Sequence, residues 1–401
     1  MGRWLKLARN IIAAGALLFL LTLTFLWFWS YPPKPGSFFE ADLPLSSPPG
    51  RLVRSEDYRT KDLPKGASAR RILYTTTLNG GVPATASALV IWKEEAGGGA
   101  PRRAVAWGNG TIGAVPGCAV SLQKDPLTNI PAVPELVEEG WVFIASDYAG
   151  LATPGPHPYL IGEGEARSIL DAVRAAHDLE ELTISLETVI WGHSQGGHGA
   201  LWAGMLAKTY APELQVRGVA AIAPGSDLPA MLTEIEATPA GRLFSSYVAR
   251  AYADTYPDLY FDGVVRPGAR WQAREMARRC LADGRAIVPA FIASQLTEGS
   301  IFSSRNTGTA FRRRLAENVP TRPIGVPILI LQGTKDEVVA EPIQATYVAG
   351  RCRAGERVDY QPLRAHDHLS IVQPGAPTTG ILMTWSRARF AGRAGASTCP
   401  D

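Results

Sequence analysis

The sequence predicts an α/β fold in which helices cover both faces of a mostly parallel β-sheet. Short apolar runs rich in β-branched residues alternate with stretches of helical periodicity. The composition is globular, with 46% hydrophobic and 19% charged residues in a chain of 401. The alternation is interrupted once, by a long stretch rich in aromatic residues. Crossover helices between parallel strands must lie on the faces of the sheet, so this order of elements indicates buried parallel strands.

The individual elements follow from these patterns. Two strands at residues 71–77 and 84–92 flank an Asn-Gly-Gly turn and are predicted to form a hairpin. Isoleucine, valine and alanine recur with a helical period in the stretch that begins at Glu165. Further strands are predicted at 104–107, 141–146, 189–191, 219–222, 327–331 and 358–360, and helices at 130–139, 165–179, 200–208, near 345 and at 381–390.

The interruption of the pattern at residues 227–321 indicates an insertion. This stretch has helical periodicity, contains no run typical of a buried strand, and is too long for an ordinary loop. We interpret it as a helical cap, or lid, between a first core segment (51–226) and a second (322–401). Insertions at the active-site edge of a sheet usually shape access to the site. The alternative is a set of peripheral helices without a role in binding.

The N-terminus carries a hydrophobic segment. Residues 11–29 are uncharged and, at about 1.5 Å per residue, long enough to span the hydrocarbon layer of a bilayer, roughly 30 Å thick. Basic residues precede this run and aromatic residues end it, as at a membrane–water boundary. They are Arg3, Lys6 and Arg9 on one side and Trp27, Trp29 and Tyr31 on the other.

We therefore predict that residues 1–30 are an uncleaved signal anchor, because no small-residue cleavage site follows the run. The basic end would lie inside, and the rest of the chain would be periplasmic or extracellular. The alternative is cleavage of a signal peptide and secretion. The proline- and serine-rich residues 31–50 are interpreted as a linker between membrane and domain.

Charge and cysteine content limit the kinds of partner, cofactor and cellular compartment that the sequence allows. A formal net charge of +3, with scattered basic residues, gives no indication of a nucleic-acid surface. The histidines form no metal-ligand spacing with carboxylates, so neither a catalytic metal nor another cofactor is predicted. An even number of cysteines without a C-x-x-C pair suggests two disulfides in an exported domain, with three possible pairings. The cysteines are Cys118, Cys280, Cys352 and Cys399.

Ser194 lies in the most informative segment, Gly-His-Ser-Gln-Gly at residues 192–196. A serine hydroxyl needs a base, an acid that orients the base, and donors for the oxyanion. A tight turn from strand to helix lifts the serine Oγ clear of the sheet, and the glycines allow close backbone packing. The five-residue pattern alone occurs by chance in glycine-rich chains. Its position between a strand and a helix predicts a nucleophile rather than an ordinary N-cap serine.

In the α/β-hydrolase architecture, the acid and the histidine follow the serine in chain order, each after a later strand. Asp336 comes just after the strand at 327–331 and a Gly-Thr turn, and is the predicted acid. A helix N-cap role is the alternative for Asp336. The loop after the last strand contains His366 and His368. We predict His368 as the base, with His366 as the alternative.

An oxyanion hole requires two backbone N–H groups. One comes from the residue after the nucleophile, here Gln195. The second is expected from the Gly-Asn-Gly-Thr loop after the strand at 104–107, with Asn109 as the first choice and Gly110 as the second. The small residues there would allow close approach to a tetrahedral intermediate. A simple glycine turn is the alternative.

These segments resemble the secretory lipase family of the lipase A type, which are α/β-hydrolases of yeasts and actinobacteria. The resemblance covers roughly residues 50–395. It is carried by Ala-Trp-Gly-Asn-Gly-Thr at 106–111, Cys-Ala at 118–119, Ser-Asp-Tyr-Ala-Gly-Leu at 146–151, His-Pro-Tyr-Leu at 157–160, Gly-His-Ser-Gln-Gly-Gly at 192–197, Gly-Thr-Lys-Asp-Glu-Val-Val at 333–339 and Asp-His at 367–368.

The resemblance implies a Ser194–His368–Asp336 triad and a helical lid over an acyl pocket. It also implies oxyanion donors from Gln195 and the Asn109 region. The sequence departs from the bacterial branch of the family, which carries histidine at the position of Asn109 and Cys-Ala-Pro-Ser at residues 118–121. The resemblance further implies two disulfides, Cys118–Cys280 and Cys352–Cys399.

The function expected from these observations is a membrane-anchored serine carboxylic-ester hydrolase acting on acylglycerols or similar esters. The alternatives are a short-chain esterase on a non-lipid ester, a peptidase of the same fold, and a non-catalytic binding module. A binding module would be expected to have lost part of the triad, and the features typical of peptidases are not seen. The sequence gives no oligomeric state. Several cap residues would suit an acyl chain or form the cap's own core: Phe244, Tyr247, Tyr252, Phe291, Ile292 and Phe302.

Overall fold

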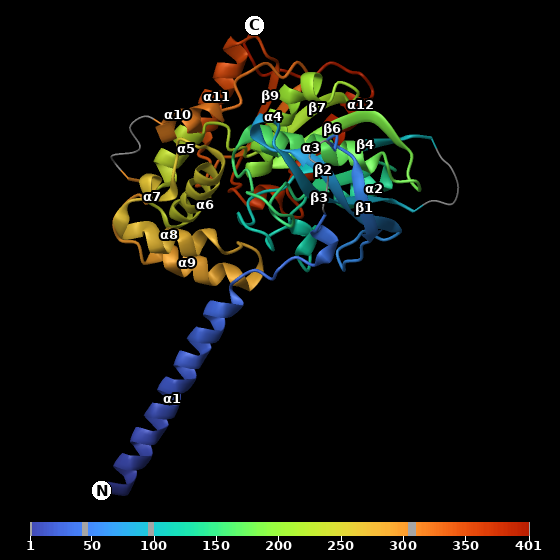
Figure 1. The fold of residues 1–401 in the computed structure, drawn as a ribbon. Coiled ribbons are helices and arrows are strands. Elements are labelled where there is room, and N and C mark those ends of the chain that lie inside the picture. The colour runs from blue at the N-terminus through green and yellow to red at the C-terminus, as the bar shows by residue number, and fades with distance from the viewer. Residues whose placement is uncertain (1, 42–46, 95–99, 304–309, 401) are drawn as a thin grey trace.

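The chain is built around one nine-stranded sheet in a computed structural model that describes residues 2–41, 47–94, 100–303 and 310–400 (Figure 1). The strand order is β1-β2-β3-β5-β4-β6-β7-β8-β9. Strands β1, β2, β3 and β5 pair antiparallel in turn, and every pair from β5 to β9 is parallel. The predicted α/β class is confirmed. The strands are β1 (Leu52–Asp57), β2 (Ala67–Thr77), β3 (Pro83–Lys93), β4 (Arg102–Gly108), β5 (Val142–Ser146), β6 (Ile184–His193), β7 (Gln215–Ile222), β8 (Ile328–Gly333) and β9 (Val358–Leu363).

Helices pack on both faces of this sheet. The central strands are buried on both sides, so adjacent side chains of β6 enter different cores. Ile190 belongs to the core under α3, α4 and α11, and Trp191 belongs to the core under α2 and α12. The Trp191 Nε1–H donates to Ser386 Oγ of α12 at 3.0 Å. These helices are α2 (Val133–Glu138), α3 (Gly162–Ala176), α4 (Gln195–Tyr210), α11 (Glu341–Arg353) and α12 (Thr378–Phe390).

Strand β1 was absent from the sequence prediction. It lies at the edge of the sheet and pairs only with β2. Most of its side chains are partly or fully exposed, so the strand lacks the apolar alternation that marks β2 and β3. An edge strand of this kind forms because the neighbouring strand provides backbone hydrogen-bond partners. The local sequence of the edge strand does not reveal those partners.

The inserted stretch folds as a helical cap between β7 and β8 (Figure 1). Its described residues contain no strand and only one isolated β-bridge, Val265 to Phe302. The cap residues form a second core, in which Tyr247 and Tyr252 are fully buried and which also includes Leu160 and Val339 of the sheet domain. Tyr252 Oη donates to the carbonyl of Leu160 in the sheet domain at 2.9 Å. The cap helices are α5 (Leu228–Ile235), α6 (Pro239–Thr255), α7 (Phe261–Val264), α8 (Arg270–Ala277), α9 (Ile287–Ser294) and α10 (Ala310–Glu317).

Two disulfides fasten peripheral segments. Cys118 pairs with Cys280, with 5.3 Å between the Cα atoms, and so ties the loop after β4 to the cap. Cys352 pairs with Cys399 and ties the C-terminal segment to α11. This is the pairing that the family resemblance implies.

Helix α1 (Gly2–Trp29) projects from the body, and its lower part makes no contact with it (Figure 1). A window of 18 residues within Arg3–Trp29 has a mean hydropathy of 2.4, so the helix is long and apolar enough to cross a membrane; an N-terminal signal sequence has the same properties. The segment predicted as a linker differs from a free spacer where it is described. Phe39 is buried in the main core, and the Arg71 guanidinium lies 5.4 Å from its ring.

Candidate active site

Ser194 occupies a strained turn between β6 and α4, with φ 56° and ψ −117°. A positive φ is unfavourable for a residue with a side chain and is found mainly where the surrounding structure enforces it. Two glycines make the turn possible. A Cβ on Gly192 would lie 2.0 Å from the carbonyl oxygen of Gly196, and one on Gly196 would lie 1.8 Å from that of Gly108. Only glycine therefore allows the end of β4 and the start of α4 to meet at the serine.

The structure brings together the three residues that the sequence predicts as a triad. His368 Nε2 lies 2.8 Å from Ser194 Oγ, and His368 Nδ1 lies 2.8 Å from Asp336 Oδ2. Ser194 follows β6, Asp336 follows β8 and His368 follows β9. The three residues therefore gather at the edge formed by the carboxyl ends of these parallel strands. All three groups are within the hydrogen-bond reach that proton transfer from a serine requires.

The alternatives for the acid and the base have other contacts. Within the described part of the chain, the ring of His366 makes no hydrogen bond, and its carbonyl accepts from the backbone N–H of Lys335 at 2.9 Å. Asp336 is not the N-cap of the following helix α11, because Ala340 occupies that position. Glu337, the neighbour of Asp336, is exposed.

Several donors surround the carboxylate of Asp336. The backbone N–H groups of Val338 and Val339 each donate to Oδ1 at 2.8 Å, and Gln332 Nε2 donates to Oδ2 at 3.0 Å. Burial by itself would raise the pKa of Asp336, but the hydrogen bond and charge of His368 and the backbone donors outweigh it and lower the pKa below its usual value. An ionised Asp336 accepts the Nδ1–H of His368, which leaves Nε2 free to accept the serine proton.

His193 packs against His368. Its ring lies 4.9 Å from the ring of His368, and its Nε2 lies 2.9 Å from the carbonyl oxygen of His368. Burial, together with the nearby charge of His368, lowers the pKa of His193 to about 3. His193 is therefore neutral at physiological pH and donates Nε2–H to that carbonyl, which fixes the loop that carries His368.

The loop after β4 lies against Ser194. A Cβ on Gly110 would come within 3.2 Å of His193 Nδ1 and 3.9 Å of Ser194 Cβ. Both ends of the Asn109 amide are engaged: Oδ1 accepts from Trp107 Nε1 at 2.8 Å, and Nδ2 donates to the carbonyl of Ser146 at 2.7 Å. The Asn109 side chain thus holds the ends of the neighbouring strands β4 and β5.

A buried network that sequence reasoning did not identify holds Gln195. Its Nε2 donates to Glu165 Oε1 at 2.8 Å and to His157 Nε2 at 3.0 Å. Burial lowers the pKa of His157 to about 4, so this ring is neutral and donates Nδ1–H to the carbonyl of Ala149 at 3.1 Å. Glu165 also lies 2.7 Å from His198 Nδ1. An acidic residue in the first turn of a helix is usually a favourable partner of the helix dipole, so nothing in the local sequence distinguishes Glu165.

A cavity of about 780 Å³ opens onto Ser194. Of the six cap residues that the sequence offers for an acyl chain, only Phe244 lines it. Phe291 is exposed, and the other four are buried in the core of the cap. The lining residues are Trp107, Asn109, Gly110, Thr111, Ile112, Val120, Gln123, Lys124, Asp125, Pro126, Asn129, Ile130, His193, Ser194, Phe244, Leu281, Ala282, Asp283, His368, Leu369 and Val372.

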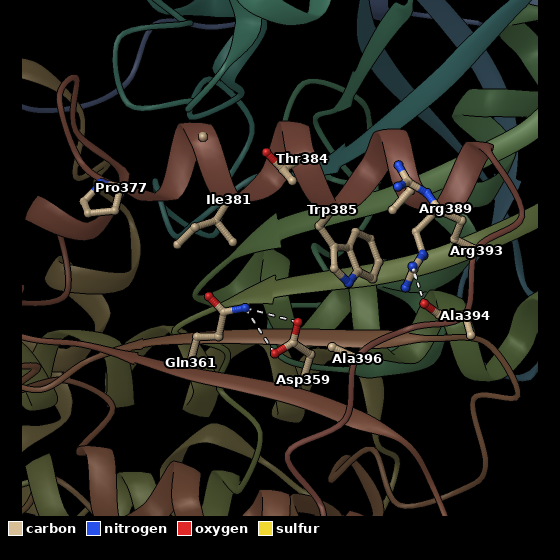
Figure 2. Close-up of a pocket in the computed structure, with 12 residues that line it drawn as sticks. Asp359, Gln361, Pro377, Ile381, Thr384, Trp385, Arg389, Arg393, Ala394 and Ala396 are labelled. Carbon is tan, nitrogen blue, oxygen red and sulfur yellow. Dashed lines mark hydrogen bonds between the residues drawn. The ribbon is translucent and has the colours of Figure 1, made fainter.

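A second hollow, of about 720 Å³, lies between β9 and α12 (Figure 2). Asp359 and Gln361 reach it from β9, and Trp385 and Arg389 reach it from α12. Gln361 Nε2 donates to both oxygens of Asp359 at 3.1 Å. No residue of the predicted triad lines this hollow, which is separate from the cavity at Ser194.

No group of three or more potential metal-ligating side chains is present among the described residues. The absence of a catalytic metal stays a prediction of the sequence.

Comparisons with known proteins agree on family and fold. Residues 120–398 match the family model described as secretory lipase. The chain is 26% identical to lipase 6 of Candida albicans over 292 residues, which are 67% of this chain and 59% of that protein. It is also 26% identical over 380 residues to a probable inactive lipase of Mycobacterium tuberculosis, covering 86% of this chain and 79% of that protein. A secreted triacylglycerol lipase of Malassezia globosa is 26% identical over 285 residues, 66% of this chain and 59% of the relative.

Solved structures show the same fold. Candida antarctica lipase A superposes with a TM-score of 0.74 at 18% identity, over 92% of this chain and 88% of that one. The rice cell wall degrading esterase LipA from Xanthomonas oryzae gives a TM-score of 0.71 at 20% identity, over 86% of this chain and 100% of that one. The fold is therefore that of the α/β-hydrolases. The chain spans about 59% of the length of the two fungal relatives matched by sequence.

Proposed function

Because this chain belongs to the secretory lipase family, we propose that it is a serine carboxylic-ester hydrolase that cleaves acylglycerols or similar acyl esters. The observation that carries the proposal is the continuous line of hydrogen bonds from Ser194 through His368 to Asp336, with 2.8 Å at each step. The cavity that opens onto Ser194 provides space for an acyl group.

The reaction follows from this arrangement. Ser194 Oγ attacks the ester carbonyl carbon while His368 Nε2 takes its proton, and the carbonyl becomes an oxyanion. The backbone N–H groups of Gln195 and of the loop at Asn109 or Gly110 stabilise that charge. His368 then gives the proton to the leaving alkoxide, and the acyl group remains on the serine. A water molecule, deprotonated by the same imidazole, releases the acid and restores Ser194.

One relative is named as probably inactive, so a non-catalytic member of the family is the alternative to consider. The triad of this chain supports activity, because Asp336 is held by two backbone donors and His368 contacts both partners. A binding module would have no need to keep a neutral His193 packed against the base.

A fluorophosphonate probe tests the proposal, since it reacts only with an activated serine. We expect the wild type to be labelled on Ser194 and Ser194→Ala to remain unlabelled, with both proteins showing the same thermal unfolding. Hydrolysis of p-nitrophenyl butyrate should disappear in the same variant. A wild type that neither reacts with the probe nor hydrolyses the ester would be a binding module.

The acyl-chain preference separates a lipase from a short-chain esterase. The cavity wall includes the apolar side chains Phe244, Leu281 and Leu369 and has room for more than a short acid. We expect kcat/KM for p-nitrophenyl esters to rise from acetate to chains of about eight carbons, since each buried methylene contributes about 0.8 kcal/mol. A decline beyond butyrate would indicate a short-chain esterase.

Helix α1 is also proposed to stay attached as a membrane anchor. The guanidinium of Arg279, which is fully buried, lies 4.2 Å from the ring of Trp27 and 4.0 Å from that of Tyr31. Its Nε donates to Ser30 Oγ at 2.7 Å, and Nη1 pairs with Glu275 at 2.7 Å. Cleavage at the end of α1 would remove the Trp27 ring that covers this charge, and a desolvated cation–π contact is worth about 2 kcal/mol.

The mass of the mature protein in the membrane fraction tests this anchoring. We expect a full-length chain that resists extraction by carbonate. A mature N-terminus after Trp29, with the protein in the soluble fraction, would favour secretion instead.

A further inference from the structure

Helix α9 exposes an apolar face. Ile287 and Phe291 are 65% and 63% exposed, and Ala290 and Ser294 share this face at helical spacing. The opposite face is buried in the cap. No charged residue occurs between Arg285 and Glu298. A short helix that is apolar both on its buried face and on its exposed face is typical of a site where a protein partner or a lipid surface covers the exposed face.

The surroundings of α9 indicate what covers it. Figure 1 shows α8 and α9 along the edge of the body from which α1 emerges. The Arg285 guanidinium, two residues before the start of α9, lies 5.6 Å from the ring of Trp29, the last residue of α1. Trp271 of α8 is 59% exposed and stacks on Trp27 with 5.9 Å between ring centroids and 4° between planes.

Tryptophans at the end of a spanning helix lie at the headgroup level of a bilayer. If α1 spans the membrane, the membrane surface is at the level of Trp27 and Trp29, and therefore at the level of Trp271 and the start of α9. The exposed face of α9 carries no charge that would recognise a charged partner. Position and chemistry both favour lipid as its occupant.

The same segment leads directly to the active site. Leu281, Ala282 and Asp283 line the cavity that contains Ser194, and they immediately precede the residues that contact Trp29. The Cys118–Cys280 disulfide and a hydrogen bond from the Leu281 N–H to the Ile112 carbonyl, at 2.8 Å, fix this segment to the sheet domain. The mouth of the cavity is thus joined to the anchor by a short, fastened stretch of chain.

We propose that the exposed face of α9, together with Trp271, is a bilayer-contacting surface beside the anchor, through which the cavity takes acyl-lipid substrates from the membrane that holds the enzyme. The inference rests on the proposed ester hydrolysis and anchoring, and it names the source of the substrate. Lipids in that membrane are held close to the cavity mouth, so their effective concentration is high without any affinity of the free enzyme for them.

The test uses the full-length protein in vesicles of phosphatidylcholine and phosphatidylglycerol that contain a fluorogenic long-chain diacylglycerol. Phe291→Glu and Ile287→Glu place a charge on the proposed surface. We expect each to lower hydrolysis of the vesicle-borne ester by about tenfold or more and to leave hydrolysis of soluble p-nitrophenyl butyrate unchanged. Leu186→Glu is the matched control, since Leu186 is also exposed but lies at the start of β6, at the opposite edge of the sheet from Ser194. It should change neither rate.

A photoreactive phosphatidylcholine, with its reactive group in the acyl chain, gives a readout that does not depend on activity. We expect it to label the tryptic peptide that begins at Ala286 in the wild type and to label Phe291→Glu less. Equal vesicle rates in the variants and the wild type, with that peptide unlabelled, would overturn the proposed surface. A wild type that does not hydrolyse the soluble ester would instead overturn the proposed function. Photolabelling of the α9 peptide would then still show whether this surface contacts the bilayer.

Discussion

The catalytic edge of the sheet and the cap beside it are held in place in different ways. At the sheet edge, Ser194, Asp336 and His368 each follow a parallel strand, and the pairing of β6 to β9 fixes the spacing of their loops. The described part of the cap contains no strand, and side-chain packing attaches it to the sheet domain, because Leu160 and Val339 belong to the same hydrophobic cluster as the cap residues. The Cys118–Cys280 disulfide and the hydrogen bond from Tyr252 to Leu160 add to this attachment.

This difference suggests separate roles: the sheet edge would carry out the chemical step, and the cap would control how the substrate reaches the site. Proton transfer along the triad needs positions accurate to a few tenths of an ångström, which a hydrogen-bonded ladder supplies. The cap forms part of the cavity wall and, in our proposal, faces the membrane. These roles depend on the chemical character of its surface more than on the exact position of any one atom. Changes at the sheet edge should therefore affect the rate of the chemical step, and changes in the cap should affect stability and substrate selection.

The largest effect is expected for Asp336→Asn. An amide can donate to His368 Nδ1 and would favour the tautomer that cannot accept the serine proton, so kcat on p-nitrophenyl butyrate should fall about 10⁴-fold. Glu337→Gln makes the same chemical change at the exposed neighbouring residue and should leave kcat within about twofold. Equal losses in both variants would contradict the assignment of the acid.

Removal of the cap disulfide should act on stability. Cys118→Ala combined with Cys280→Ala opens a loop of 162 residues and should lower the free energy of unfolding by about 5 kcal/mol in the chain-entropy model. The matched pair, Cys352→Ala with Cys399→Ala, opens 47 residues and should cost about 4 kcal/mol. Urea unfolding measures both. If the Cys118→Ala/Cys280→Ala variant kept its stability but lost kcat on the soluble ester, the proposed division of roles between the sheet edge and the cap would be wrong.

Phe244→Ala should change substrate selection. Phe244 is half-buried in the cap and lines the cavity, so its truncation removes acyl-chain contacts. We expect kcat/KM for an octanoate ester to fall about tenfold and that for acetate to change little. Phe261→Ala provides the comparison, because Phe261 is a half-buried cap residue that does not line the cavity. A similar loss for both esters would mean that Phe244 only supports the fold.

The smallest effect concerns pH. The folded-state pKa of His157, about 4, is below its ordinary value of 6.5, so the unfolded chain binds more protons between these values. Stability should therefore fall as the pH drops from 6.5 towards 4, with about 1 kcal/mol per pH unit coming from His157. His157→Gln should reduce this slope in urea unfolding, whereas His366→Gln, outside the buried network, should not. An unchanged slope in His157→Gln would show that the ring is not kept neutral by burial.

Much of the site was predictable because each triad residue has a local signature. Ser194 stands between glycines that a strained turn requires, and Asp336 and His368 each follow a strand in the expected chain order. Glu165 has no such signature, since its role depends on Gln195 and His157, which approach it only in the folded chain. Phe39 lies in a proline-rich stretch that is typical of a linker, yet it is buried in the main core.

The sequence by itself determined the α/β class, the placement of Ser194, Asp336 and His368 after successive strands, and the presence of an apolar N-terminal helix. These properties depend on periodicity, glycine placement and run length, which are local. Only the tertiary structure decided that Phe244 lines the cavity while Phe291 faces outwards, and that Arg279 is covered by the end of α1. The side that a helix exposes depends on what packs against it, and those partners are distant in the chain.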